Sequence, residues 1–167
     1  MSLLSTIETE VQSEIERLGP WTTKFQFNGK TIGGPYEVSE DELLLRQFRE
    51  RLPYAERVLE LGCMEGGRTF PLARRVGHVV GVDVRREHLQ RARFIQRERN
   101  VQNVTLLEMD LEVTDLETLG TFDAIHNVGL LYHMADPAKL LRQLAAIAPE
   151  MLLWTYVVDD GDAAQGG

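Results

Sequence analysis

The 167-residue sequence has one cysteine, four histidines and no long apolar run. The single cysteine, Cys63, excludes an intrachain disulfide and a metal site built from several cysteines. No apolar stretch approaches the roughly 18 residues that a membrane-spanning helix needs, so we expect no membrane partner. The histidines form no pattern such as H-E-x-x-H, so we expect no metal. The first residues carry glutamates where a signal peptide would carry lysine and a long apolar block, which predicts a cytoplasmic protein.

Basic residues are fewer than acidic ones and are concentrated in one part of the chain. The 18 lysines and arginines against 26 aspartates and glutamates give a net charge of −8, which argues mildly against a nucleic-acid partner. Nine arginines lie between Arg68 and Arg99. They either coat the exposed faces of two helices or form a phosphate-binding patch, and we favour the helix faces. A nucleic-acid partner is therefore considered but not favoured.

The stretch from Val58 to Val84 reads VLELGCMEGGRTFPLARRVGHVVGVDV, and the rest of the chain is organised around it. An apolar run ends at Gly62, a helical pattern covers about 67–75, and a second apolar run ends at Asp83. Strand, glycine turn, helix and strand in this order form the first unit of a doubly wound nucleotide-binding sheet. An acid about twenty residues after the glycine stands where such folds bind ribose hydroxyls. The sequence therefore predicts an α/β fold with a mostly parallel sheet and helices on both faces.

Two segments of this unit resemble motifs of one enzyme family. ELGCMEGGRT resembles motif I of the class I S-adenosylmethionine-dependent methyltransferases, and GVDV resembles the acidic strand end that follows it. Met64 replaces the second glycine of the G-x-G-x-x-G pattern, which argues against a pyrophosphate ligand and hence against a nicotinamide oxidoreductase. The resemblance implies S-adenosylmethionine as cofactor and assigns its contacts here to Glu60, Gly62, Cys63, Gly66, Asp83 and Val84. The alternatives are that Glu60 and Asp83 are ordinary polar residues at strand ends and that Cys63 is only a small packing residue.

A third strand is predicted at Val104–Glu108, after a helix over about 86–99. Asp110 and Leu111 follow this strand. In the methyltransferase family an acid at this position commonly lies beside the adenine, so the resemblance assigns both residues to the cofactor. The alternative is that Asp110 caps a turn.

The segment FDAIHNVGLLYHMADP, from Phe122 to Pro137, predicts a fourth strand that Gly129 ends, and then a helix capped by Asp136. It resembles the pattern F-D-x-x-x-x-x-G-x-L-Y-H-x-x-D-P of a branch that includes wobble-uridine tRNA-modifying enzymes and small-molecule methyltransferases. The resemblance assigns Asn127 and Gly129 to the cofactor. It places Tyr132 and His133 beside the acceptor, with His133 as the candidate general base. Alternatively, Tyr132 and His133 shape the pocket or form hydrogen bonds to the backbone at the turn. His126 is expected to pack in the core.

The first 38 residues are expected to form a helix followed by an aromatic connector. Leu4, Ile7, Val11, Ile15 and Leu18 recur at helical spacing, and Gly19-Pro20 ends the helix. Trp21 is expected to pack this helix onto the domain, and the segment from Phe25 to Tyr36 is a candidate lid over the cleft. A capping box is expected at Ser39 to Glu42, with a helix over about 40–51. The cofactor domain is expected over 39–158 and a flexible tail over 159–167.

The expected fifth strand, Met151 to Val158, is followed by only nine residues. The methyltransferase family ends its sheet with an antiparallel hairpin beyond this strand, and the hairpin is missing here. The strand would be a long apolar edge, and such edges recruit other chains. We therefore expect pairing with a second copy through 151–158, with exchange of the N-terminal helix as a variant, or else a longer parent protein.

These observations favour a methyltransferase acting on a small-molecule acceptor, with a tRNA base as a weaker candidate. The alternative is an S-adenosylmethionine-binding module that regulates or scaffolds without turnover. The acceptor atom is left open, because oxygen, nitrogen and carbon acceptors share this scaffold.

Overall fold

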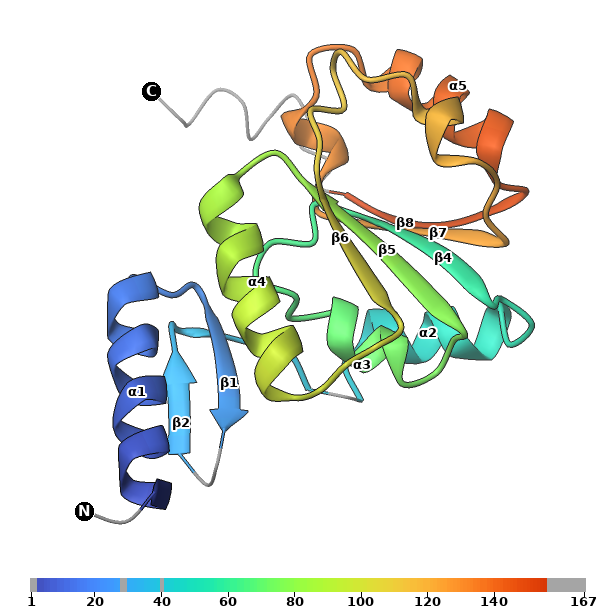
Figure 1. Cartoon of the computed structure of the whole chain (residues 1–167). Coiled ribbons are helices and arrows are strands. Elements are labelled where there is room, and N and C mark those ends of the chain that lie inside the picture. Colours follow the sequence, from blue (N-terminus) through green and yellow to red (C-terminus); the bar gives the residue numbers. More distant parts are fainter. Residues whose placement is uncertain (1–2, 28–29, 40, 156–167) are drawn as a thin grey trace, which may run out of the picture.

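The computed structural model describes residues 3–27, 30–39 and 41–155. Its larger sheet has five parallel strands in the order β6-β5-β4-β7-β8 (Figure 1). These strands are β4 Arg57–Leu61, β5 His78–Asp83, β6 Val104–Glu108, β7 Ala124–Val128 and β8 Glu150–Trp154. The chain runs outward from β4 through β5 to β6 and then returns to the other side of β4 for β7 and β8. The order therefore reverses between β4 and β7, where doubly wound folds bind ligands at the carboxyl ends of the strands.

Helices cover both faces of this sheet, which confirms the predicted doubly wound Rossmann-like class (Figure 1). One face carries α2 Leu43–Arg51, α3 Thr69–Ala73 and α4 Arg86–Glu98, and the other carries η1 Leu116–Leu119 and α5 Pro137–Ile147. Because successive strand residues point to opposite faces, Val58 packs with the first group and Leu59 with the second. No helix within the described residues is long and apolar enough to cross a membrane. The cytoplasmic location stays a prediction.

The connector after the first helix contains a small sheet that the sequence does not predict. The helix α1 Leu3–Leu18 is followed by three short strands, β1 Thr23–Phe27, β2 Lys30–Gly33 and β3 Tyr36–Glu37, in the order β2-β1-β3. Figure 1 shows α1, β1 and β2 beside α4, on the side of the molecule away from α5. Short strands of this kind depend on contacts with the rest of the domain, so local sequence patterns do not reveal them.

The aromatic residues of the connector hold this unit on the domain. The indole N–H of Trp21 donates to the carbonyl oxygen of Ile15 at 2.8 Å. Its ring meets Phe25 and Phe94 edge-on, with ring centroids 6.1 and 5.9 Å apart, so the predicted packing of Trp21 is confirmed. Phe25 is buried in the same apolar cluster. Its side chain therefore packs in the core, whereas Tyr36 at the other end of the segment is exposed.

The helix α2 begins at Leu43 and not near residue 40, so the predicted capping box is wrong. Glu42 itself is the N-cap, and its carboxylate accepts from the N–H of Leu45 at 3.1 Å. Ser39 takes part only through its carbonyl oxygen, which accepts from the N–H of Glu42 at 3.1 Å. The same Glu42 carboxylate binds Arg68 at 3.0 Å. Holding both the helix end and Arg68 keeps Glu42 in an extended conformation outside the helix.

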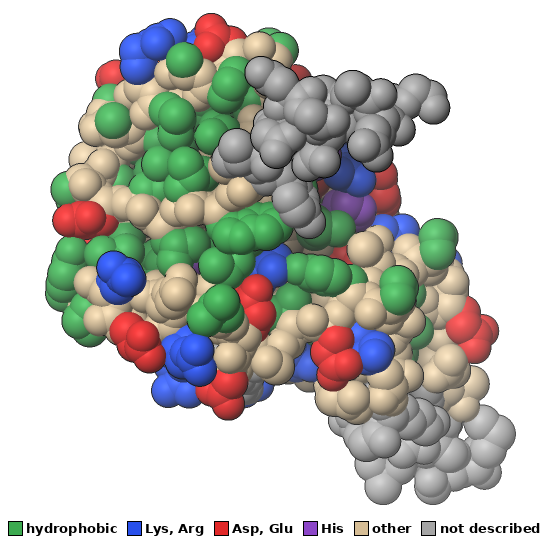
Figure 2. Space-filling view, turned by 180° about the vertical axis from the view of Figure 1, so that it is seen from behind, with side chains coloured by type: hydrophobic (Ala, Val, Ile, Leu, Met, Phe, Trp, Pro, Cys, Tyr) green, Lys and Arg blue, Asp and Glu red, His purple; other side chains and the backbone are tan. Residues whose placement is uncertain are grey.

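The strand β8 lies at an edge of the sheet, because β7 is its one neighbour in the described part of the chain. Leu153 and Trp154 are exposed on it. Figure 2, which views the molecule from behind, shows apolar side chains on the larger, upper part of that side. The predicted strand end at Val158 and the predicted tail over 159–167 lie outside the described residues. Pairing of the edge with a second copy stays a prediction.

The carboxylate of Asp123 joins the start of β7 to the start of β4. Its Oδ2 accepts from the N–H groups of Glu56 and Arg57 at 2.9 and 2.7 Å. The two N–H groups, that of Arg57 first, lower the pKa of the Asp123 carboxyl. Because the folded state prefers the ionised form, the stability that it contributes is present above the unfolded pKa and is lost as the pH falls through the folded pKa.

We predict that Asp123→Asn is less stable than the wild type at pH 7 and that the gap narrows below about pH 4, near the ordinary pKa of an aspartate. Urea unfolding of both proteins across this pH range measures the gap. A gap that stays constant down to pH 3 would contradict the role given to these two hydrogen bonds.

Candidate functional site

The loop from Gly62 to Gly67 turns sharply at the carboxyl end of β4. Gly62 has a φ of +66°, and a Cβ there would lie 3.3 Å from Cδ1 of Leu130. Met64, which stands where a second glycine is expected, also adopts a left-handed conformation, with φ +49°. That conformation costs a non-glycine residue roughly 1–2 kcal/mol. The Met64 N–H donates to Oδ2 of Asp83 at 2.9 Å, and this bond helps to offset the cost.

A cavity of about 340 Å³ opens beside this loop, at the carboxyl ends of β4 to β7. Seven of the residues assigned from the sequence line it, namely Gly62, Asp83, Val84, Asp110, Leu111, Gly129 and His133. Arg68 and Leu130 also line it. The cavity therefore brings together residues that are up to about seventy positions apart in the chain, as the carboxyl ends of parallel strands do.

Asp83 has a structural role besides any ligand contact. Its Oδ2 accepts from the N–H of Met64 and its Oδ1 from the N–H of Arg85, at 2.9 and 2.8 Å. The Nδ1 atom of buried His88 lies 3.7 Å from Oδ1. An ionised carboxylate offers about four lone-pair sites, so two remain for the hydroxyl groups of a ligand.

Asp110 forms a turn and lines the cavity at the same time. Its Oδ1 accepts from the N–H of Glu112 at 2.9 Å, and its carbonyl oxygen accepts from the hydroxyl of Thr114 at 2.6 Å. The alternative expectation, that Asp110 caps a turn, is thus confirmed by its bond to the N–H of Glu112. It does not exclude a ligand contact, because Asp110 and Leu111 both border the larger cavity.

A second, much smaller cavity of about 20 Å³ adjoins the first and shares Gly62, Met64, Arg68 and Val128 with it. Glu60 and His126 line it from directly opposite positions on β4 and β7, with Oε1 and Nδ1 3.6 Å apart. Glu60 is 4% and His126 1% exposed. Neither Oε2 of Glu60 nor either ring nitrogen of His126 has a hydrogen-bond partner among the described residues. Buried polar atoms without partners are rare, so their concentration here indicates a place for a polar ligand group or a water molecule.

Arg68 is a site residue that the sequence does not single out. Its guanidinium donates to Oε1 of Glu42 at 3.3 and 3.0 Å and to the hydroxyl of Tyr36, and it lies 5.5 Å above the Tyr36 ring. It lines both cavities. The sequence places it among nine arginines expected on helix surfaces, and its position in the first turn after the glycine loop is the one signal of a different role.

The remaining residues assigned from the sequence lie around these cavities. Cys63 is buried and lines the smaller one. Gly66 and Asn127 line neither cavity. A Cβ on Gly66 would lie 2.3 Å from the Phe70 ring. The Asn127 side chain is buried beside Met151. Tyr132 is exposed in the short helix η2 Leu131–His133, with its ring 4.3 Å from that of His133.

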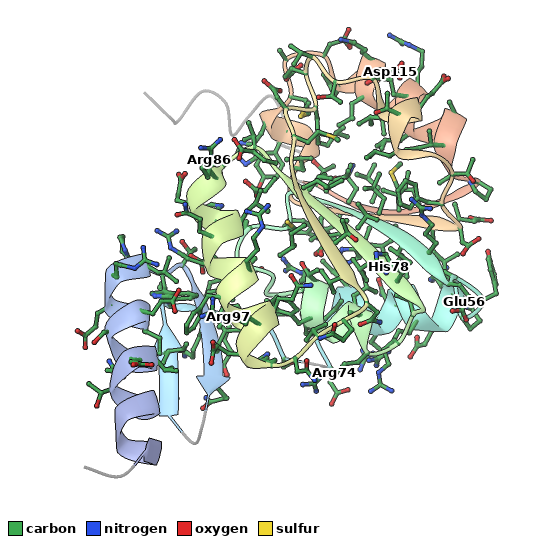
Figure 3. The ribbon with its side chains drawn as sticks, viewed as in Figure 1. Glu56, Arg74, His78, Arg86, Arg97 and Asp115 are labelled. Atoms are coloured by element: carbon green, nitrogen blue, oxygen red, sulfur yellow. The ribbon has the colours of Figure 1, made fainter. Side chains whose placement is uncertain are left out.

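Most of the arginines between Arg68 and Arg99 bind protein groups. Arg86 pairs with Glu108 at 3.0 Å and Arg97 with Glu14 at 2.8 Å. Figure 3 shows these two at opposite ends of α4. Arg91 is buried, which the sequence does not predict. Within the described residues no group of three His, Cys, Asp or Glu side chains could hold a metal ion.

A doubly wound sheet, a left-handed glycine turn and acids at the ends of β4 and β5 define a nucleoside-binding domain of the methyltransferase type. The chain belongs to the methyltransferase domain family, which matches residues 54–158. This agrees with the resemblance read from the two motifs.

Individual relatives agree with the family. The chain is 32% identical to the ubiquinone biosynthesis O-methyltransferase of Aeromonas salmonicida (strain A449) over 94 residues, which are 56% of this chain and 39% of that protein. It is 36% identical to the N-terminal domain of EvdMO1 with SAH bound, with a TM-score of 0.78 over 84% of this chain and 62% of that one. The same domain in the presence of SAH and D-fucose gives 38% identity and the same TM-score, over 84% and 61%. The chain thus spans 39% of the first relative and 62% and 61% of the two solved structures, less than two thirds of each.

The thiol of Cys63 should be unreactive in the folded protein. Burial raises its pKa well above the ordinary value, and the negative charges of Glu60 and Asp83 raise it further. We predict that a disulfide reagent modifies Cys63 slowly at pH 7 and completely once the protein is unfolded, with Cys63→Ala as the blank. Rapid reaction of the native protein would show an accessible thiolate instead.

Proposed function

We propose that the chain binds S-adenosylmethionine in the two adjoining cavities and transfers its methyl group to a small-molecule acceptor. The observation that carries the proposal is the placement of Glu60, Asp83 and Asp110 around one glycine turn, at the ends of neighbouring strands. The match to an SAH-bound domain supports the same ligand. A cavity of about 340 Å³ also lies within the usual range of small-molecule sites, roughly 300–1,000 Å³.

The nucleoside end of the ligand fits the larger cavity. Asp83 has lone pairs left for the ribose hydroxyls, and Asp110 borders the space in which the adenine would lie. Leu111, Met109 and Leu130 give that space apolar walls. Hydrogen bonds to an ionised acceptor are stronger than neutral ones, so Asp83 should contribute much of the affinity.

The amino-acid end would lie where the two cavities adjoin, because the smaller one alone has room for little more than one polar group. A zwitterion needs an anionic partner for its ammonium and a cationic partner for its carboxylate. Glu60, with its unpaired Oε2, offers the first and Arg68 the second. The free nitrogens of His126 lie beside Glu60 and give a further polar contact at this end.

The sulfonium group of the cofactor supplies the activated methyl, so this chain has to position the acceptor, exclude water and handle a proton. His133 borders the larger cavity, with its ring tilted by 50° against that of Tyr132, and we assign it the role of taking a proton from an acceptor hydroxyl. The exposed Tyr36, held by Arg68, stands at the rim where a lid would limit water. The named O-methyltransferase relative supports an oxygen acceptor.

The proposal is tested by titrating the full chain with S-adenosylmethionine and S-adenosylhomocysteine and then assaying S-adenosylhomocysteine release with a panel of phenols and sugars. Binding with turnover supports the methyltransferase. Binding without turnover on any acceptor supports the alternative of a regulatory or scaffold module. A tRNA transcript in the same panel tests the weaker nucleic-acid candidate.

Gly62→Ala and Gly120→Ala form a matched pair for the glycine turn. Both glycines have positive φ, so each alanine should cost stability, on the order of 1–3 kcal/mol. A Cβ at position 62 would lie against Leu130, which lines the cleft. A Cβ at position 120 would have no atom within 4 Å. We predict that Gly62→Ala loses at least about tenfold, or about 1.4 kcal/mol, in S-adenosylhomocysteine affinity by calorimetry because the added methyl group takes space beside the ligand, while Gly120→Ala retains its affinity. Equal affinities would remove Gly62 from the site.

His133→Ala should lower turnover far more than cofactor affinity. A general base contributes about 10²–10⁴-fold, so the fall in kcat should lie in that range. His78→Ala is the matched control, because His78 begins β5 at the opposite end of the sheet (Figure 3) and binds Thr105 at 2.9 Å. Turnover of His133→Ala equal to that of the control would make His133 a pocket-shaping residue.

A further inference from the structure

Glu65 is a carboxylate with no exposed surface inside the glycine loop. Its exposure is 0%, and the cavities are lined by its neighbours Met64 and Gly67, not by Glu65 itself. The N–H of Thr22 donates to both of its oxygens, at 2.9 and 3.1 Å. The N–H of Thr23 donates to Oε2 at 2.6 Å. Glu65 thus binds the start of β1, more than forty positions earlier in the chain.

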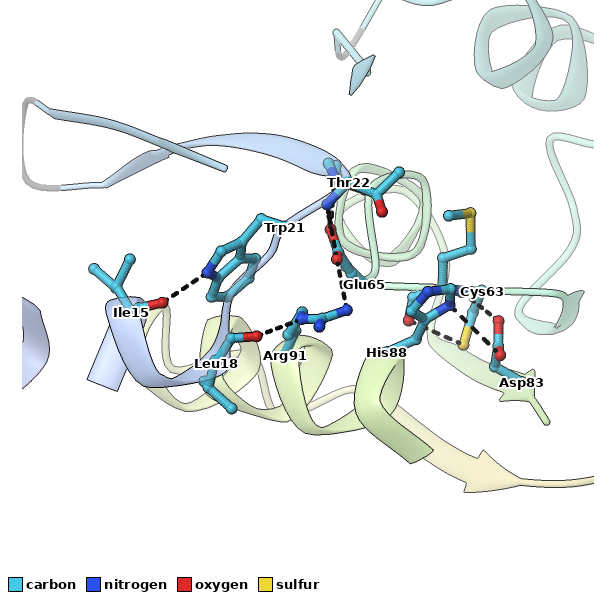
Figure 4. Close-up of polar contacts among 11 residues, drawn as sticks. Ile15, Leu18, Trp21, Thr22, Cys63, Glu65, Asp83, His88 and Arg91 are labelled. Carbon is cyan, nitrogen blue, oxygen red and sulfur yellow. Dashed lines mark hydrogen bonds and ion pairs between the residues drawn. The ribbon is translucent and has the colours of Figure 1, made fainter. Parts of the chain in front are cut away.

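Arg91 of α4 neutralises this buried charge (Figure 4). Its Nη1 lies 3.3 Å from Oε1 of Glu65, and its Nε donates to the carbonyl oxygen of Leu18 at 2.7 Å. Arg91 is only 8% exposed. The pair therefore joins four segments, which are the end of α1, the start of β1, the glycine loop and α4. Each buried charge depends on the other, because a lone one would be left uncompensated.

The segment that Glu65 holds is one wall of the smaller cavity. Thr23, Tyr36 and Val38 line that wall. The glycine loop touches it directly, since a Cβ on Gly67 would lie 2.8 Å from Cγ2 of Thr23. The wall and the loop face each other across the space assigned above to the amino-acid end of the cofactor. The carboxylate of Glu65 binds the wall at Thr22 and Thr23, and Arg68, directly after the loop, binds it at the Tyr36 hydroxyl.

We propose that Glu65 is a positioning residue that holds the N-terminal wall against the glycine loop and so sets the affinity for the cofactor's amino-acid end. The proposal rests on the proposed function. Without the carboxylate, the Thr22 and Thr23 amides and the Arg91 guanidinium lose their acceptor, and the wall separates from the loop. A ligand that contacts both parts should in turn order the wall, because coupling between two sites is reciprocal.

The test compares S-adenosylhomocysteine with adenosine, which lacks the amino-acid end, on the full chain. Calorimetry should show that Glu65→Gln loses about tenfold or more in affinity for S-adenosylhomocysteine, the effect of one or more lost hydrogen bonds, with less than about twofold change for adenosine. Glu65→Asp, which keeps the charge, should recover part of the loss. Glu108→Gln is the control. It removes the exposed partner of Arg86, which lies on α4 as Arg91 does, and its affinities for both ligands should match those of the wild type. Hydrogen exchange of residues 18–27 should slow with ligand in the wild type and not in Glu65→Gln.

Two results would overturn the proposal while leaving the proposed function intact. One is an unchanged affinity for S-adenosylhomocysteine in Glu65→Gln. The other is an equal loss for both ligands, which would indicate general damage to the fold. If Glu65→Gln does not fold, Arg91→Lys takes its place, since it keeps the cation and removes the contact of Nε with Leu18. A wild-type chain that binds neither ligand overturns the proposed function, and this proposal with it.

Discussion

The carboxylate of Asp83 holds together the two segments between which the cleft forms. One oxygen takes the N–H of Met64 and the other that of Arg85, so the loop after β4 and the start of α4 share one anchor. The β4–β5 ladder ends at Leu61 and Val82, and one further backbone bond, from the Cys63 N–H to the carbonyl oxygen of Val82 at 3.0 Å, continues it into the loop. The left-handed backbone conformation of Met64 is unfavourable by itself, and the hydrogen bond from its N–H to Asp83 helps to stabilise it. Glu65 then fastens the N-terminal unit to the other side of the same loop.

The charges around the cleft are arranged for a ligand that carries both signs. Glu60, Asp83 and Asp110 come from the ends of three neighbouring strands, and Arg68 stands between the two cavities. Parallel strands bring such residues together from distant parts of the chain, because their carboxyl ends meet at one edge of the sheet. A cationic sulfonium with a zwitterionic tail and a hydroxyl-rich sugar matches this set better than a polyanion would. This agrees with the acidic balance of the whole chain.

The sequence predicts the parts of this design that local patterns encode. Gly62 and Asp83 are recognisable because a turn and a strand end impose their residue types at a fixed spacing. The facing pair Glu60 and His126 is not recognisable, since it depends on β7 returning to lie beside β4. The strands β1 to β3 are not predicted for a similar reason, because they depend on distant contacts such as the bonds from the amides of Thr22 and Thr23, at the start of β1, to Glu65. The sequence does not distinguish Arg68 and Arg91 from surface arginines, because their acidic partners, Glu42 and Glu65, are distant in the chain.

A crystal structure of the chain with S-adenosylhomocysteine tests the central claim most directly. We predict that the ribose hydroxyls bind Asp83 and that the adenine lies beside Asp110. The ligand's carboxylate should bind Arg68, and its ammonium should point toward Glu60 and His126. Density for the ligand elsewhere, or in this cleft with its amino-acid end turned away from Arg68 and Glu60, would contradict it.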